Sequence, residues 1–201
     1  MNSDALHPCA DQYLVPPVLR QLKKFLGERP ARLMDIGCGD GYAASCYAEA
    51  GYSAVGFDVS ADDVSQARAR YPHLRFEVAS VYDADLFERL SAPVDAVVAL
   101  EVVEHLVQPK KLFEQSRRLL KDGGILILST PYHGYGKNLA LSLLGSWDQH
   151  HSVSWDGGHI KFFSKRSLAA MAREAGFRNL RLFGVGRIPY FWKSMVLVAE
   201  K

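Results

Sequence analysis

The stretch 33-LMDIGCGDGYAA-44 joins an apolar run to a segment of helical period through three alternating glycines. Glycine permits a tight turn and a close approach of the backbone to a ligand. Asp35 stands two residues before Gly37, and Gly39 and Gly41 follow. A glycine-rich turn between a first strand and a first helix is typical of the ligand-binding edge of an open parallel sheet. The stretch therefore predicts both a fold and a site.

Apolar runs alternate with helix-period segments along the rest of the chain. The pattern predicts strands at 31–37, 52–60, 74–80, 94–100 and 125–130, and helices at 42–51, 61–71, 83–92 and 109–121. Repeated strand–helix steps predict an α/β fold with a doubly wound parallel sheet. A further helix is expected at 164–177, and the runs at 178–186 and 190–201 predict an antiparallel pair of strands.

Length and composition agree with a single domain over residues 1–201. The chain is 48% hydrophobic and 23% charged, which is ordinary for a globular protein. No apolar stretch approaches the roughly 20 residues that cross a bilayer. The first residues lack the basic and apolar regions of a signal peptide, and the odd number of cysteines suggests free thiols. A cytoplasmic location is expected.

The charge is unevenly distributed along the chain. The net charge of +2 does not by itself imply a nucleic-acid partner. Residues 159–201 carry nine Lys and Arg against two acidic residues, a net of +7, whereas residues 1–158 carry 15 against 20, a net of −5. Such asymmetry marks either a site for anionic ligands or a solvated basic face.

The glycine turn departs from the dinucleotide pattern G-x-G-x-x-G, because the third glycine comes one residue early and Tyr42 takes its place. The Asp35 carboxylate would repel a pyrophosphate but suits a ligand with an amino group. Asp58 ends the second expected strand 21 residues after Gly37, where an acidic side chain accepts ribose hydroxyls. Together these residues predict a ligand with an amine and a ribose.

These motifs resemble those of the class I S-adenosylmethionine-dependent methyltransferases. LMDIGCGDG is similar to their first motif, D/E-x-G-x-G-x-G, and VGFDVS to their acidic second-strand motif. Residues 93–131 resemble their fourth strand, fourth helix and fifth strand. The resemblance extends over roughly residues 30–180. It is closest to the ubiquinone-biosynthesis type of O-methyltransferase and the broader type 11 group.

The resemblance implies a Rossmann-like, seven-stranded sheet with helices on both faces, and S-adenosyl-L-methionine as cofactor. It also implies which residues surround the cofactor. Those expected at the methionine part are Asp35, Gly37 and Gly39; at the ribose and adenine, Asp58, Val59, Ser80 and Val81; and at the end of the fourth strand, Leu100 and Glu101. The family often has an Asp at the adenine edge, and VASVYDA offers none in clear register.

Methyl transfer from a sulfonium requires alignment of the acceptor and an acceptor atom that is nucleophilic. A hydroxyl must lose its proton, either to a histidine or to solvent while bound to a metal. The candidate bases are His105, His133, His150, His151 and His159, and those assigned a catalytic role are His105, His159 and His151.

The segment 101-EVVEHL-106 places Glu101, Glu104 and His105 on one face if the chain is helical there. It resembles the E-x-x-E-H motif that holds a divalent metal in some eukaryotic ubiquinone O-methyltransferases and in small-RNA 3′-end 2′-O-methyltransferases. GGHIKFF resembles the segment that supplies a further histidine in the RNA enzymes, here His159. The resemblance thus implies a Mg, Mn or Co site. Type 11 enzymes that need no metal share the "EH", so a structural role remains open.

Residues 131–163 form a long segment rich in aromatic residues and histidine, with one expected helix at 137–145. So long an insert after the fifth strand predicts a lid or an acceptor-binding loop.

The expected function is methylation of a small phenolic or vicinal-hydroxyl acceptor at oxygen. One alternative is 2′-O-methylation of the terminal ribose of RNA, against which the absence of an added RNA-binding module argues. The other is a regulatory protein that binds S-adenosylmethionine without catalysis. The sequence predicts a small-molecule partner and no membrane span, and it does not predict the oligomeric state.

Overall fold

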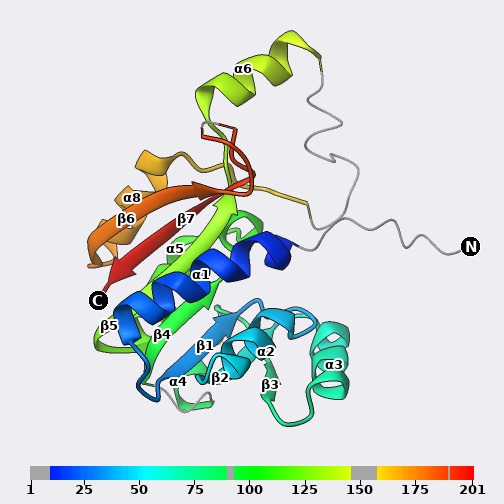
Figure 1. Cartoon of the computed structure of the whole chain (residues 1–201), viewed down its shortest axis with the longest axis vertical. Coiled ribbons are helices and arrows are strands. Elements are labelled where there is room, and N and C mark those ends of the chain that lie inside the picture. The colour runs from blue at the N-terminus through cyan, green and yellow to red at the C-terminus, as the bar shows by residue number, and fades with distance from the viewer. Residues whose placement is uncertain (1–9, 90–92, 146–157, 190) are drawn as a thin grey trace, which may run out of the picture.

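The computed structural model describes residues 10–89, 93–145, 158–189 and 191–201. In these ranges, seven strands form one sheet in the order β3-β2-β1-β4-β5-β7-β6 (Figure 1). Their bounds are β1 (Arg32–Ile36), β2 (Ser53–Asp58), β3 (Arg75–Val78), β4 (Val94–Ala99), β5 (Leu120–Pro131), β6 (Arg178–Val185) and β7 (Ser194–Glu200). Strands β1 to β5 are parallel, and β7 is antiparallel to both β5 and β6. The doubly wound sheet and its antiparallel C-terminal pair are confirmed.

Helices cover both faces of the sheet (Figure 1). One face carries α1 (Ala10–Leu26), α2 (Tyr42–Glu49) and α3 (Ala61–Arg70), and the other carries α4 (Leu86–Arg89), α5 (Lys110–Leu119) and α8 (Lys165–Glu174). Each face has its own hydrophobic cluster, and β4 is buried along its whole length between them. None of the helices in the described ranges combines the length and the apolar character needed to cross a membrane.

Two short elements follow the carboxyl ends of the central strands. The 3-10 helix η1 (Val103–His105) comes after β4, and α6 (Tyr135–Leu143) comes after β5. Helix α6 stands away from the sheet at the top of Figure 1.

Local signals in the sequence explain where two helices, α3 and α8, begin. The Ser60 side chain accepts a hydrogen bond from the Asp63 N–H at 3.2 Å and caps α3. Ser164 and Ser167 form a reciprocal capping pair at the start of α8. Such side chains accept hydrogen bonds from amides that lack a partner within the helix.

The boundary between α5 and β5 differs from the sequence expectation. We expect the helix to continue to Lys121, but it ends at Leu119. The chain enters β5 at once because Leu120 pairs with Val94. The pairing register then shifts before Ala96, and Gly123 takes a left-handed φ of 74° within the irregular stretch.

Helix α1 was not predicted from the sequence. Pro16 and Pro17 lie inside this helix and lack the N–H groups of a regular hydrogen-bonding pattern. The helix nevertheless buries one stripe of side chains, because Leu14, Val18 and Leu22 recur every fourth residue and are fully buried. That spacing is the signal that could have revealed it.

The carboxyl ends of the parallel strands meet at one edge of the sheet. Strands β1 and β4 are neighbours, and the chain leaves β1 toward β2 but β4 toward β5. The order of strands therefore reverses between β1 and β4, which is where open α/β sheets bind their ligands. The glycine turn after β1, Asp58 at the end of β2 and Glu101 after β4 all lie at this edge.

The buried stripe of α1 generates a test of stability. Leu22→Ala should lower the free energy of unfolding by about 2–5 kcal/mol, because it leaves a cavity between α1 and the sheet. Lys24→Ala, an exposed change two residues along the same helix, should alter it by less than about 0.5 kcal/mol. Urea unfolding followed by circular dichroism measures both. Equal effects of the two changes would show that α1 does not stabilise the fold through this stripe.

Candidate active site

The glycine turn has a backbone that other residues adopt rarely. Gly37, Gly39 and Gly41 have left-handed φ angles of 71°, 50° and 85°. A Cβ atom on Gly37 would lie only 2.4 Å from Cγ2 of Val102. Glycine is therefore required at this position so that the segment after β4 can pack against the turn.

Asp58 organises the turn from the neighbouring strand. Its carboxylate accepts hydrogen bonds from the N–H of Gly39 at 3.0 Å and from the N–H of Ser60 at 2.9 Å. An ionised carboxylate offers about four acceptor positions. Asp58 can therefore hold the turn and still accept two further hydrogen bonds from a ligand.

A cavity of about 440 Å³ opens at this edge of the sheet. That volume lies within the range of roughly 300–1,000 Å³ usual for small-molecule sites. Six of the nine residues expected around the cofactor line it, namely Gly37, Asp58, Val59, Ser80, Val81 and Glu101. The other three, Asp35, Gly39 and Leu100, are not among its lining residues. Asp35 and Leu100 are buried, and Gly39 contributes through its bond to Asp58.

One wall of the cavity was not expected from the sequence. Tyr82 lines it, and its hydroxyl accepts a hydrogen bond from the Gln108 N–H at 3.1 Å. Asp83, the acidic residue nearest to the adenine position in sequence, instead accepts a hydrogen bond from the Ser80 N–H at 2.9 Å and pairs with Arg89. The carboxylate often found at that edge in the family is therefore not supplied by Asp83.

Glu101 is held in an unusual conformation at the end of β4. Its φ of 53° lies in the left-handed region, which is uncommon for a residue other than glycine. The Glu101 N–H donates to the Ser129 hydroxyl oxygen at 3.0 Å, and that hydroxyl donates to the Glu101 carboxylate at 2.7 Å. This reciprocal pair fixes Glu101 on the cavity wall. Strained backbone of this kind concentrates at functional sites, and no sequence signal pointed to Ser129.

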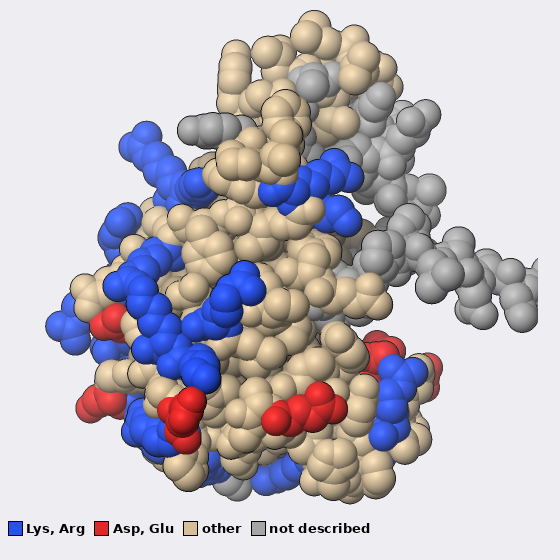
Figure 2. All heavy atoms as spheres, viewed as in Figure 1, with Lys and Arg blue, Asp and Glu red and all other residues tan. Residues whose placement is uncertain are grey.

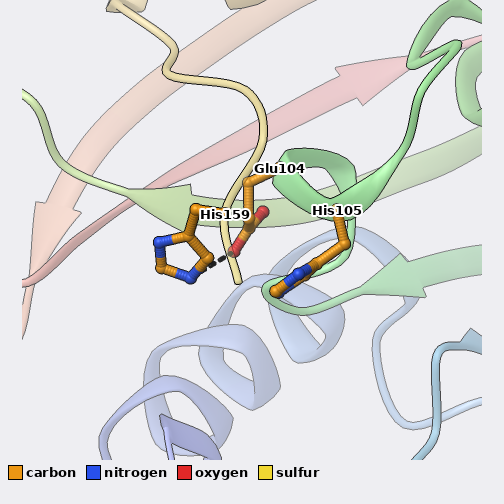
Figure 3. A group of neighbouring side chains, drawn as sticks. All are labelled: Glu104, His105 and His159. Carbon is orange, nitrogen blue, oxygen red and sulfur yellow. Dashed lines mark ion pairs between the residues drawn. The ribbon is translucent and has the colours of Figure 1, made fainter. Parts of the chain in front are cut away.

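Glu104, His105 and His159 come together beside the cavity (Figure 3). One potential ligand atom from each lies within 4.8 Å of the others. The Glu104 carboxylate is 4.0 Å from Nε2 of His159, and the two imidazole rings meet edge to face with centroids 5.0 Å apart. His105 also lines the cavity. We call these three residues the Glu–His–His cluster.

Backbone hydrogen bonds explain how a histidine from the insert reaches η1. The Glu104 carbonyl accepts hydrogen bonds from the N–H groups of Ile160 and Lys161, both at 3.0 Å. These bonds fix the segment before α8 against η1, so His159 faces the Glu104 side chain (Figure 3).

The cluster differs from the sequence expectation in two respects. The chain forms a single turn of 3-10 helix after β4, so Glu101 does not share a helical face with Glu104 and His105. Glu101 bonds to Ser129 and lies outside the group of possible metal ligands found among the described residues. His151 and His150, the other histidines of the insert, lie outside the described residues.

Glu104 is fully buried. Burial first, and then the Glu101 carboxylate, raise the pKa of Glu104 well above its ordinary value. The Thr130 hydroxyl and the Glu104 amide are near enough to oppose this shift. Neither Glu104 oxygen, however, accepts a hydrogen bond from any residue in the described part of the chain. A buried ionisable group of this kind beside a cavity is typical of a functional site.

Cys38, in the glycine turn, is not a candidate nucleophile. Burial, followed by the Asp35 and Asp58 carboxylates, raises the pKa of its thiol. The thiolate, which is the reactive form, is therefore disfavoured.

Comparison with known proteins identifies a family for this chain. A family described as a methyltransferase domain matches residues 10–182. The chain is 29% identical over 198 residues to a ubiquinone biosynthesis O-methyltransferase of Ruegeria pomeroyi, covering 94% of this chain and 78% of the relative. It is 32% identical over 125 residues to the protein of that name from Maricaulis maris, covering 60% of this chain and 49% of the relative.

Solved structures show the same fold. Magnesium protoporphyrin IX methyltransferase from Synechocystis, with bound SAH, superposes with a TM-score of 0.73 at 19% identity and covers 96% of this chain and 84% of that one. A 1,6-didemethyltoxoflavin-N1-methyltransferase from Burkholderia thailandensis superposes with a TM-score of 0.67 at 20% identity, covering 93% and 77%.

The sheet order, the glycine turn and the cavity at the switch point define a class I S-adenosylmethionine-dependent methyltransferase. This chain belongs to the methyltransferase-domain family, and it is an enzyme that uses S-adenosyl-L-methionine. Both statements confirm the resemblance found in the sequence.

The burial of Glu104 generates a test based on pH. Because its pKa is raised in the fold, this group favours folding in acid, and that contribution is lost as the pH rises through the raised pKa. Glu104→Gln removes the charge, so at neutral pH it should raise the free energy of unfolding by about 1 kcal/mol or more. The gain should disappear as the pH approaches the ordinary glutamate pKa of about 4.3.

Urea unfolding across this pH range measures the effect. Glu114→Gln is the matched control, because Glu114 is exposed on α5, where its carboxylate forms an ion pair with Lys111. A Glu104→Gln variant that is less stable than the parent protein at neutral pH would show that the carboxylate is satisfied in the fold.

Proposed function

We propose that this methyltransferase transfers the methyl group to a hydroxyl oxygen of a small phenol or vicinal diol, with His159 as the base. The Glu–His–His cluster beside the cavity carries the proposal, because it offers a proton acceptor where an acceptor hydroxyl must lose its proton. The names of the Ruegeria and Maricaulis relatives support methylation at oxygen.

We assign the cofactor to the cavity of about 440 Å³. The free acceptor positions of Asp58 suit the two ribose hydroxyls, and Val59, Ser80 and Val81 would border the adenine. Tyr82 joins this group as a further wall. The methionine part would lie near Gly37, Gly39 and Glu101, with Asp35 supplying negative charge toward its amino group and Leu100 packing behind.

In the proposed reaction, Nε2 or Nδ1 of His159 takes the proton from the acceptor hydroxyl. The oxygen attacks the methyl carbon of the sulfonium, the carbon–sulfur bond breaks, and S-adenosylhomocysteine leaves. The imidazolium then returns its proton to solvent. The positive charge of the imidazolium would favour the ionised form of Glu104, whose carboxylate, 4.0 Å from Nε2 in this structure, would then stabilise the imidazolium and orient the ring. His105 would lie between the cofactor and the base, because it lines the cavity and touches the His159 ring.

A metal-assisted version of the same reaction is the second candidate. Two imidazoles and one carboxylate form a donor set that suits Mn²⁺, Co²⁺ or Mg²⁺, and the buried Glu104 oxygens fit a cation because no described residue hydrogen-bonds to them. A bound cation would lower the pKa of an acceptor hydroxyl. Glu104, His105 and His159 would hold it, and Glu101 would not, because its carboxylate bonds to Ser129.

The acceptor would approach under the insert of residues 131–163. At its two described ends, the rings of His133 and Phe162 meet edge to face with centroids 5.0 Å apart, so the ends of the insert lie together. Residues 146–157, the middle of the insert, lie outside the described residues. We propose that the whole chain forms one methyltransferase domain with this insert as its acceptor-binding part.

The cofactor assignment predicts a loss of affinity in Asp58→Ala. Removing the charged acceptor of two ribose hydroxyls should weaken S-adenosylmethionine binding about tenfold or more, since hydrogen bonds to charged groups contribute about 1.5–3 kcal/mol. Isothermal titration calorimetry measures the affinity. Asp40→Asn is the control, because Asp40 belongs to the same turn but accepts from the Tyr42 N–H and pairs with Arg70. If both variants lost the same affinity for S-adenosylmethionine, Asp58 would stabilise the turn without contacting the ribose.

The base assignment predicts that His159→Ala lowers kcat with a catechol acceptor about 10²–10⁴-fold and leaves cofactor affinity nearly unchanged. His73→Ala, an exposed histidine before β3, serves as the control and should retain the parent activity. Turnover of His159→Ala close to that of the parent would reject both versions of the mechanism.

Chelation separates the two versions. Without a metal, exhaustive EDTA treatment should leave turnover intact. Loss of turnover that Mg²⁺, Mn²⁺ or Co²⁺ restores would establish the metal version. A second assay compares two acceptors, catechol and a short RNA with a free 3′-terminal ribose. Both present adjacent hydroxyls, so a preference for one of them decides between a small acceptor and the RNA alternative.

A further inference from the structure

Large apolar side chains are exposed together at one end of the molecule. Helix α6 exposes Tyr135, Leu139 and Leu143, and Leu144 follows directly after it; Leu143 and Leu144 are 78% and 76% exposed. The loop between β6 and β7 exposes Ile188 and Phe191. We call these six residues the apolar crest. A group of large exposed apolar side chains is typical of a binding surface.

The two parts of the crest are attached to each other. The Tyr132 ring, just before α6, meets the Trp192 ring edge to face with centroids 5.0 Å apart. The Tyr132 N–H also donates to the Lys193 carbonyl at 2.9 Å. Figure 1 shows the β6–β7 loop lying at the base of α6. The crest therefore projects from one end of the sheet as a unit.

Cations stand directly behind the crest. The Lys165 ammonium lies 4.5 Å from the Trp192 ring centroid, Lys193 lies 5.0 Å from the Tyr13 ring centroid, and Arg187 is exposed next to Ile188. Figure 2 shows Lys and Arg gathered over the half of the molecule that carries β6, up to the base of the α6 protrusion, with acidic side chains lower down.

The described segments that form this end of the molecule are themselves free of acidic residues. Residues 131–145, 158–173, 178–189 and 191–199 contain no Asp or Glu. Of the cations in residues 159–201, Lys165, Arg187 and Lys193 stand behind the crest, and Arg178 and Arg181 belong to β6. The proposed methyl transfer does not explain why positive charge is concentrated in the C-terminal part of the chain. A binding surface for an anionic partner at this end would explain it.

We infer that the apolar crest docks this enzyme onto an anionic lipid bilayer surface. Aliphatic and aromatic side chains at the tip would enter the headgroup region, and the cations behind them would face the lipid phosphates. A second copy of the chain fits less well, because crest-to-crest pairing would bring two basic flanks together. A nucleic acid also fits less well, because the tip of the crest presents aliphatic side chains and not the cations that contact phosphates. The inference does not depend on the identity of the methyl acceptor.

Vesicle co-sedimentation of the full chain tests the inference. Binding to vesicles of phosphatidylcholine with phosphatidylglycerol should exceed binding to phosphatidylcholine alone, and added salt should weaken it. Leu143→Ser with Leu144→Ser should lower the partition coefficient about tenfold or more. Lys165→Ser with Arg187→Ser should lower it by a similar factor on anionic vesicles only.

Matched controls lie elsewhere on the surface. Val107→Ser removes a side chain that is 70% exposed outside the crest, and Lys23→Ser with Lys24→Ser removes two charges from the last turn of α1. Both should bind vesicles like the parent protein. Cofactor affinity measured in every variant confirms that each remains folded.

Two outcomes would overturn the inference. One is parent-like vesicle binding by the Leu143→Ser, Leu144→Ser variant. The other is a dimer in light scattering that this variant abolishes, without vesicle binding by the parent protein, which would assign the crest to a second copy of the chain.

Discussion

The pair of hydrogen bonds from Ile160 and Lys161 to the Glu104 carbonyl is the interaction on which the candidate site depends. Strand β4 delivers Glu104 and His105 to the edge of the sheet, but His159 lies more than fifty residues further along the chain. The two backbone bonds fix that distant segment against η1 and place its imidazole beside the buried carboxylate. Because they involve only main-chain groups, they orient His159 without occupying any side chain that the chemistry needs.

The candidate site combines well-packed strands with two features that lower the stability of the fold. Strands β4 and β7 are buried between two hydrophobic clusters, and this core holds the strand ends in place. At the edge, Glu101 adopts a left-handed φ and Glu104 is buried without a hydrogen bond from the described residues. Both features oppose folding, and proteins retain such features mainly where function requires them. Their position beside one cavity is the physical argument that it is the active site.

Much of the fold could be predicted from the sequence, because it depends on local patterns. Non-alternating apolar runs such as Ile125–Leu128 predict strands covered on both faces. Ser60 or Asp62 was available to cap α3, and the structure uses Ser60. The glycine turn and Asp58 predict the ligand edge. Helix α1 was not predicted because two prolines interrupt its helical pattern. The start of β5 was not predicted because the pairing of Leu120 with Val94 is a tertiary contact.

The site was predictable only in part. Residue types at the ends of strands identified most of the cavity, and the grouping of Glu104, His105 and His159 followed the resemblance. The expectation that Glu101 shares a face with Glu104 and His105 depended on a helix, and the chain makes one 3-10 turn there instead. Tyr82 and Ser129 carry no motif, since their roles arise from hydrogen bonds between segments that fold together only in the tertiary structure.

A crystal structure with S-adenosylhomocysteine and a catechol bound would show whether the Glu–His–His cluster activates the acceptor. We expect the nucleoside in the cavity bordered by Asp58 and Tyr82. We also expect one catechol oxygen within hydrogen-bonding distance of His159, on a line toward the cofactor sulfur. A catechol bound in line with the sulfur but out of reach of both His159 and His105 would show that the cluster does not activate the acceptor.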